Sequence, residues 1–194
     1  GAVVVAGAFT TDALVTTAMA GNNLTVAGAT TIPGTVTMTT ATLDANGSFD
    51  ATGGTIDING LGNLTLASTV TDLGTLSTDF GKVTYDGTAQ TVFSDTYFDL
   101  TVATGNTKTL GGNLVIANDL TIDAGVTLDV SGSDYNINVA RHFINSGTFT
   151  MQEGLVTFDG NDDQTLTPGG SSFYAITFNN GGGSGKKLII DGTL

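Results

Sequence analysis

A fourteen-residue pattern recurs three times along the chain without gaps. It reads GSFDATGGTIDING at residues 47–60, GTLSTDFGKVTYDG at 74–87 and GTFTMQEGLVTFDG at 147–160. Each copy has one apolar residue near its start, a central glycine, and an alternating apolar pair followed by Asn-Gly or Asp-Gly. Alternation predicts a strand with one buried face, and the Asx-Gly pair predicts a turn. A strand–corner–strand arc that recurs in this way is typical of a solenoid.

The spacing of the copies predicts the length of one solenoid turn. The first two copies begin 27 residues apart and the last two 73 apart, which is close to three turns of about 24. We therefore expect about 24–27 residues per coil and roughly seven or eight coils. Four short apolar segments between the copies fit the same rhythm, at residues 113–116, 119–122, 126–130 and 136–139.

Composition supports an all-β fold. Only 12% of residues are charged, and the polar surface is supplied by Thr, Ser, Asn and 28 glycines. Threonine is β-branched and suits a pleated, half-buried surface, while glycine suits tight corners. We predict a right-handed parallel β-helix. An antiparallel β-sandwich is the alternative, because its short strands would give a similar rhythm.

The two ends of the chain differ from its middle. Residues 1–45 are rich in Thr and Ala and open with the apolar run Ala2–Ala6, so we expect an N-terminal coil or assembly strand there. Residues 46–194 are expected to form one continuous, repetitive β-solenoid body. The sequence stops at Leu194 in mid-pattern without a polar cap, whereas solenoid ends normally need capping to stay soluble. An uncapped end indicates either a fragment of a longer chain or a subunit that stacks on the next one.

Charge argues against two classes of partner. The formal net charge is -13, and the five basic residues are scattered (Lys82, Lys108, Arg141, Lys186 and Lys187). Binding to a phosphate backbone needs clustered Lys and Arg, so no nucleic acid partner is expected. No run approaches the roughly 20 apolar residues of a membrane helix, so no membrane insertion is expected either. The chain has no cysteine and therefore no disulfide framework.

One segment is a candidate calcium site. Asp159, Asn161 and Asp163 place oxygen ligands at alternate positions, as at the start of a calcium loop. An EF-hand loop also requires Gly at its sixth position and Glu at its twelfth, and here those positions hold Gln164 and Gly170. The prediction is therefore an irregular calcium site, with a solvated turn as the alternative. No other cofactor is predicted.

Catalytic constellations are missing from the sequence. His142 is the only histidine and follows Arg141, the only arginine, without an adjacent nucleophile and orienting acid. Glycoside cleavage would need paired carboxylates at a defined separation, whereas the aspartates fall mostly at turn or solvent positions. We therefore expect no enzymatic activity and no catalytic residue.

Threonine pairs raise the question of a flat ice-binding face, which needs threonines stacked in register. In the aligned copies the two positions decay from Thr-Thr to Thr-Ser to Ser-Asp: Thr148 and Thr150, Thr75 and Ser77, Ser48 and Asp50. Ordinary solvated strand faces are therefore expected.

The phrases GTFTMQEGLVTFDG and KTLGGNLVIANDLTIDAGVTLDVSG resemble the β-solenoid repeats of large bacterial and archaeal surface proteins. Such repeats form adhesin stalks and passenger regions of the filamentous-haemagglutinin and autotransporter type. The resemblance covers roughly residues 47–194. It implies secretion, an extracellular cell-surface location and a structural or adhesive role, and it carries over no functional residue.

The resulting expectation is a subunit of a self-assembling filament, sheath or adhesin stalk, joined end to end by β-strand pairing. Its partners would be copies of itself or flanking repeats of the same surface protein. The alternative is a carbohydrate-binding or adhesive module, with glycans as partners. Exposed aromatic side chains would support the alternative, and the candidates are Tyr97, Phe98, Phe173 and Tyr174.

Overall fold

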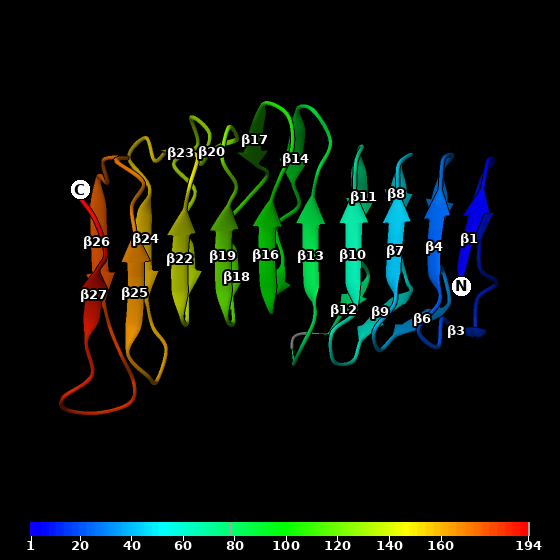
Figure 1. Ribbon diagram of the computed structural model, residues 1–194, viewed down its shortest axis with the longest axis horizontal. Coiled ribbons are helices and arrows are strands. Elements are labelled where there is room, and N and C mark those ends of the chain that lie inside the picture. The colour runs from blue at the N-terminus through cyan, green and yellow to red at the C-terminus, as the bar shows by residue number, and fades with distance from the viewer. Residues whose placement is uncertain (78, 194) are drawn as a thin grey trace.

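The chain folds as a parallel β-solenoid of about nine coils (Figure 1). A computed structural model describes residues 1–77 and 79–193. These residues form strands joined by turns, with no helix among them, and every strand pair is parallel. The prediction of a parallel β-helix is confirmed at this level, and the antiparallel sandwich is not supported.

One ten-stranded sheet, sheet A, runs the whole length of the stack. Its strands follow one another in chain order: β1 (Ala2–Val5), β4 (Asn23–Val26), β7 (Thr42–Ala45), β10 (Asn63–Leu66), β13 (Lys82–Tyr85), β16 (Asp99–Val102), β19 (Asp119–Ile122), β22 (His142–Asn145), β25 (Gln164–Thr167) and β27 (Leu188–Ile190). The ladder crosses position 45 without a break, because β7 pairs with both β4 and β10.

The other two faces of the N-terminal half are formed by two short sheets. Sheet B contains β2 (Phe9–Thr10), β5 (Thr30–Thr31), β8 (Phe49–Asp50) and β11 (Val70–Asp72). Sheet C contains β3 (Thr16–Ala18), β6 (Thr35–Met38), β9 (Thr55–Ile58) and β12 (Thr75–Leu76).

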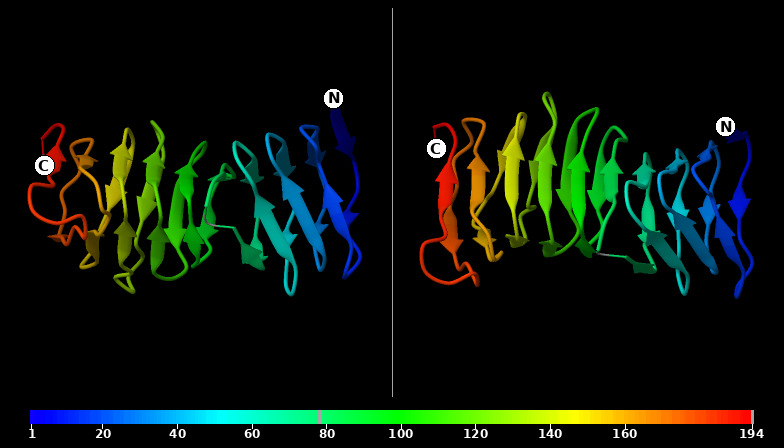
Figure 2. Two further views of the ribbon diagram at one scale, coloured as in Figure 1. Left: turned by 90° about the horizontal axis from the view of Figure 1, so that it is seen from below. Right: turned by 60° about the horizontal axis from the view of Figure 1, so that its bottom comes forward.

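Two further sheets take the same places in the C-terminal half. Sheet D contains β14 (Gln90–Val92), β17 (Thr107–Leu110), β20 (Thr127–Asp129) and β23 (Thr148–Thr150). Sheet E contains β15 (Thr96–Tyr97), β18 (Leu114–Ile116), β21 (Ile137–Val139), β24 (Leu155–Phe158) and β26 (Ala175–Phe178). Figure 2 shows the blue-to-cyan coils and the green-to-red coils as two stacks.

The coils are shorter than the 24–27 residues expected from the repeats. Successive strands of sheet A begin between 17 residues apart, from Lys82 to Asp99, and 24 apart, from Gln164 to Leu188. The expected number of seven or eight coils is correspondingly too low.

The error arises because equivalent strands of the repeat copies do not stack on one another; β12 of the second copy pairs with β9 of the first, which is the other strand of its arc. The strands of the first copy lie in sheets B and C, those of the second in sheets C and A, and those of the third in sheets D and E. Every corner between two faces needs an inward apolar residue, a turn and another alternating strand. The pattern therefore marks a type of corner, and the 27 and 73 residues between successive copies are not whole numbers of coils.

The core consists of side-chain columns that run along the stack. Inward residues of sheet A pair in register from coil to coil: Leu24, Leu43, Leu64, Val83, Leu100, Leu120, Phe143 and Leu166. All of these except the terminal Leu24 are buried. Near the C-terminal end Phe143 packs on Phe149 and Phe173 with ring centroids 5.0 and 5.5 Å away. Each coil buries its apolar face only against its neighbours, as the solenoid prediction requires.

Candidate functional site

Both ends of the solenoid present parallel strand edges. At the N-terminal end the outer strands are β1, β2 and β3, each paired on one side only. At the C-terminal end the outer strands of sheets A and E are β27 and β26. Sheet D is partly capped there, because the hydroxyl of Ser171 accepts a hydrogen bond from the amide of Phe149 at 3.0 Å. An open edge offers a row of N–H and C=O groups to another strand.

Exposed apolar side chains concentrate at these two ends. Among the described residues, eight of the eleven large hydrophobic side chains that are exposed lie in the first coil or the last two: Val3, Val4, Leu14, Val15, Tyr174, Phe178, Ile189 and Ile190. In the body of the stack the inward positions are covered by the next coil. The terminal coils lack that cover on one side, so inward residues such as Val3 and Ile190 remain in contact with solvent, while Val4 and Ile189 lie on the outer face of sheet A.

A seam divides the two halves of the molecule in the middle. Sheet A crosses it through the pairing of β10 with β13, but sheet B ends at β11 and sheet D begins at β14. The corner after each sheet A strand holds three residues in the first four coils, for example 67–69, and four in the next three, for example 86–89. The longer corner redirects the following strand, so the side face does not continue.

A register irregularity at β11 also contributes to this break. The register of β11 on β8 shifts between Val70 and Asp72, which pair with the consecutive residues Phe49 and Asp50. An extra residue of this kind bends a strand and commonly ends its pairing.

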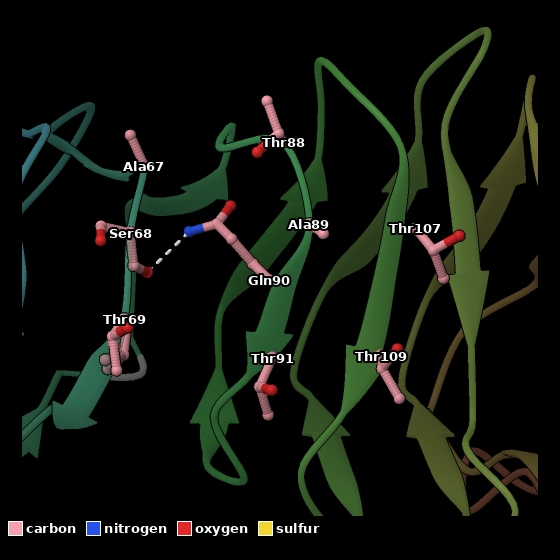
Figure 3. A pocket seen from close by; sticks show the side chains of 10 residues that line it. Ala67, Ser68, Thr69, Thr88, Ala89, Gln90, Thr91, Thr107 and Thr109 are labelled. Atoms are coloured by element: carbon pink, nitrogen blue, oxygen red, sulfur yellow. Dashed lines mark hydrogen bonds between the residues drawn. The ribbon is translucent and has the colours of Figure 1, made fainter.

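A groove of about 500 Å³ lies along the seam (Figure 3). Its walls are residues 67–70, which lead into β11, and 88–91, which lead into β14. Thr107 and Thr109 of β17 extend one side. None of the ten lining residues carries a formal charge, and most have short side chains.

Gln90 closes the inner end of this groove. Its buried amide nitrogen donates to the carbonyl oxygens of Leu66 at 2.8 Å and Ser68 at 2.9 Å, while its amide oxygen accepts from the amide of Gly87 at 2.7 Å. Gly87 lies so close to the previous coil that a Cβ there would overlap the carbonyl oxygen of Ala67. The two coils are therefore in tight contact at the corner and diverge along the strands.

Lys108 lies fully buried beside this network. Its ammonium group donates to the carbonyl oxygens of Gly87, Thr88 and Thr104, the last two at 3.1 and 2.7 Å. Three acceptors satisfy the three donors of a lysine. Burial lowers the pKa of Lys108, an effect that Asp86 partly opposes, and burial raises the pKa of Asp86. The group serves as a clamp on two corners of the main chain.

Sequence reasoning missed this lysine and the role of Gln90, although signals for both existed. In Thr107–Leu110, strict alternation with the inward Leu110 places Lys108 on the same inner face. The Gln-Thr pair recurs at Gln164, whose amide nitrogen likewise donates to a carbonyl oxygen of the preceding coil, that of Val139, at 2.8 Å.

The aspartates on the outer face of sheet A serve the backbone. The carboxylate of Asp99 accepts from the amide of Asp119 at 3.1 Å, and the carboxylate of Asp119 accepts from the amide of His142 at 3.2 Å. Burial is the main reason why the pKa of Asp119 is raised, and His142 and Arg141 oppose this shift. His142 Nδ1 is buried and forms no hydrogen bond to the described residues. The arrangement caps successive strands of sheet A.

The three calcium candidates lie in the loop between β24 and β25. The carboxylate of Asp159 accepts from the side chain of Asn138 at 3.2 Å, and that of Asp163 accepts from the amide of Lys187 at 3.0 Å. Asn161 is exposed. Beside them Asp162 forms a 2.9 Å ion pair with Lys186, which lowers the pKa of Asp162. No group of three His, Cys, Asp or Glu side chains suited to a metal occurs in residues 1–77 and 79–193, and calcium binding stays a prediction.

The threonine columns differ from those expected from the repeat alignment. The neighbours of Thr148 and Thr150 in sheet D are Thr127 and Asp129, because β23 stacks on β20. A second column runs through Thr16, Thr35, Thr55 and Thr75 in sheet C. Both faces carry a carboxylate beside the threonines, Asp129 in one and Asp57 in the other. The faces are therefore solvated, charged strand surfaces.

The four aromatic candidates for glycan binding differ in how exposed they are in the structure. Tyr97 is fully buried, and its hydroxyl lies 3.1 Å from that of Tyr85. Phe173 packs against the C-terminal core, and Phe98 is half-buried beside Phe80. Tyr174, 66% exposed, is the one of the four that presents an open ring to solvent.

No protein-family model, no curated protein sequence and no solved structure matches the chain. Across the described residues, no helix is long and apolar enough to cross a membrane. The β-solenoid architecture is thus the established property from which a function must be argued.

Proposed function

We propose that this chain is a non-enzymatic structural segment of an extracellular filament, sheath or adhesin stalk. The supporting observation is the pair of open ends, where strand edges and exposed apolar side chains coincide. Each end offers the parallel main-chain pairing and apolar surface that one coil of the stack offers the next. The terminal coils are therefore covered by copies of the chain or by flanking repeats.

Charge is compatible with this axial assembly. The net charge of -13 makes the sides of neighbouring solenoids repel one another. End-to-end contact brings together mainly backbone groups and apolar side chains, so it is affected less. Growth along the axis is thus favoured over lateral clumping.

Negative-stain electron microscopy of the purified chain at neutral pH tests the proposal. We expect particles several times longer than one solenoid, whose length rises with protein concentration. Replacing Val3 by Lys should shorten them, because Val3 (54% exposed in β1) continues the inward column of Leu24, whereas Val115→Lys on an outer face of β18 (44% exposed) should not. Equal particle lengths for the two variants, or single solenoids at every concentration, would contradict end-to-end pairing.

A second candidate function is glycan binding, which the exposed ring of Tyr174 favours. Aromatic faces are suited to stacking on the apolar side of a sugar ring. A glycan array compares the chain with its Tyr174→Ala variant. We expect at least one glycan to bind the wild type and to lose its signal with Tyr174→Ala. An array with no bound glycan, or with equal signals for both proteins, would contradict this function.

A further inference from the structure

The seam in the middle of the solenoid resembles the two ends of the stack. Partly buried apolar residues that pack on the core occur in the outer coils, for example Val5 and Phe9 at one end and Ile176 at the other. Away from the ends, Val70, Phe93 and Tyr135 share this state, and the first two lie at or beside the facing strands β11 and β14. The core is thus incompletely covered on both sides of the seam, as it is where coils stop.

The walls of the seam groove expose main chain. No ladder joins β11 to β14, so each strand has an edge turned toward the groove. The lining segment 67–70 lies before the register irregularity of β11, and the facing segment 88–91 leads into β14. They carry short side chains, among them the exposed Thr88, Ala89 and Thr91, which do not cover the backbone. The carbonyl oxygens of Ser68 and Thr88 already accept from Gln90 and Lys108, so an inserted strand would pair with the other main-chain groups of these segments. Two parallel edges that face each other across a groove can pair with one strand inserted between them.

We propose that the groove binds an extended peptide segment of another polypeptide, which adds a strand between β11 and β14. The wall segments on each side span four residues, so the inserted strand is short. Alternation places every second side chain of this strand inward, over Val70 and Phe93, and these side chains should be apolar. Asp72 and Asp95 lie nearby, so the outward side chains should be uncharged or basic.

The probe is a capped, fluorescent hexapeptide with the sequence of residues 147–152, GTFTMQ. It is uncharged, it alternates, and in the protein it contains strand β23, whose Phe149 points inward. We expect saturable binding by fluorescence anisotropy. Amide hydrogen exchange should slow in residues 67–70 and 88–92. A peptide N-methylated at alternate residues lacks donors along one edge and should bind about tenfold more weakly or worse.

Two protein variants locate the site. Ala89→Arg puts a long side chain into the groove and should weaken binding at least about tenfold, whereas Thr148→Arg, exposed on β23 of the same face, should leave binding unchanged. Val3→Lys, which places a charge in the inward column at the N-terminal edge, should also leave it unchanged. The groove can therefore be tested whether or not the ends associate.

Several outcomes would overturn the proposal. One is the absence of saturable binding up to millimolar peptide. Others are equal binding of the N-methylated peptide or equal affinity of Ala89→Arg and Thr148→Arg. Slowed exchange confined to residues 2–5 or 188–190 would assign the peptide to the ends of the solenoid and remove it from the seam.

Discussion

Lys108 is a buried, inward-facing charge whose hydrogen bonds stabilise the middle of the solenoid. Its three carbonyl partners belong to two corners, so its side chain ties its own coil to the preceding one. Lys108→Ala leaves these acceptors without their donor and opens a cavity. We expect a loss of about 2–5 kcal/mol in the free energy of unfolding, measured by urea denaturation.

The matched control for this substitution is Lys82→Ala. Lys82 is exposed on the outer face of β13, so its loss should change the free energy of unfolding by less than about 0.5 kcal/mol. If the two variants lose similar amounts of unfolding free energy, the hydrogen bonds of Lys108 stabilise the protein no more than an exposed lysine does.

The buried tyrosine pair predicts a stability decrease at alkaline pH. Burial raises the pKa of Tyr85 to about 12 and that of Tyr97 well above its usual value of 10.0. Below pH 10 the two hydroxyls are protonated in both the folded and the unfolded protein, so the tyrosine pair contributes its full stabilisation there. The contribution is lost as the pH rises from 10 toward 12, because only the unfolded state releases the protons.

Urea midpoints at pH 8, 10 and 11.5 measure this effect. The double variant Tyr85→Phe/Tyr97→Phe should lose less stability across that range than the wild type, while Tyr174→Phe should behave like the wild type because Tyr174 is exposed. The lowered pKa of Lys108 acts in the opposite direction and is present in all three proteins. Identical pH profiles for the wild type and the double variant would contradict the assignment.

Much of the residue-level pattern could be predicted from the sequence. Alternation correctly placed Ile56, Val83 and Phe158 inward, because the side-chain period of a strand is fixed at two. The partners of Lys108 and Gln90 could not be predicted, since they depend on which corners lie above one another. The same holds for Asp159 and Asp163, whose hydrogen-bond partners lie 21 and 24 residues away in the chain.

At the scale of the strand and its corner, glycine decides how closely coils approach. A Cβ at Gly160 would overlap the carbonyl oxygen of Ala140 in the previous coil, whereas a Cβ at Gly132 would meet nothing within 4 Å. Gly160→Ala should therefore cost about 1–3 kcal/mol, because the corner must move outward. Gly132→Ala should be close to neutral. Thermal unfolding monitored by circular dichroism compares them, and equal melting temperatures would refute the explanation.

Strands and corners were predictable as element types, but their place in the coil was not. The alternation of residues 155–158 and 82–85 specifies a strand, and the following Asp-Gly specifies a turn. Neither specifies which of the three faces the strand joins. A strand in any face has one side toward the same core and the other toward solvent, so all three faces require the same sequence pattern. The expected coil length failed for this reason.

At the scale of the whole molecule, the seam predicts two units that unfold separately. Each half has three continuous faces, but β10 and β13 provide the sheet pairing that crosses the middle in sheet A. In a linear array, the weakest interface sets where cooperativity is interrupted. Leu43→Ala, in the N-terminal half, should speed amide exchange in residues 1–77 much more than in residues 99–170.

Leu128→Ala, buried in the C-terminal half, is the reciprocal variant and should show the opposite pattern. Hydrogen exchange with mass spectrometry measures both proteins under the same conditions. If each substitution speeds exchange to the same extent throughout the chain, the solenoid is one cooperative unit across its seam.

The seam also affects how a rod of this kind bends. A tube that is continuous on all of its faces resists bending in every direction, because any bend stretches one face and compresses another. At the seam, sheet A is the face that stays joined, while sheets B and D meet at an open groove. Bending that widens or narrows the groove therefore requires no ladder hydrogen bond between β11 and β14 to break. A stalk built from such segments would have one flexible joint, the seam, in each segment. The direction in which the seam groove faces around the axis would set the plane in which the stalk bends under a sideways load.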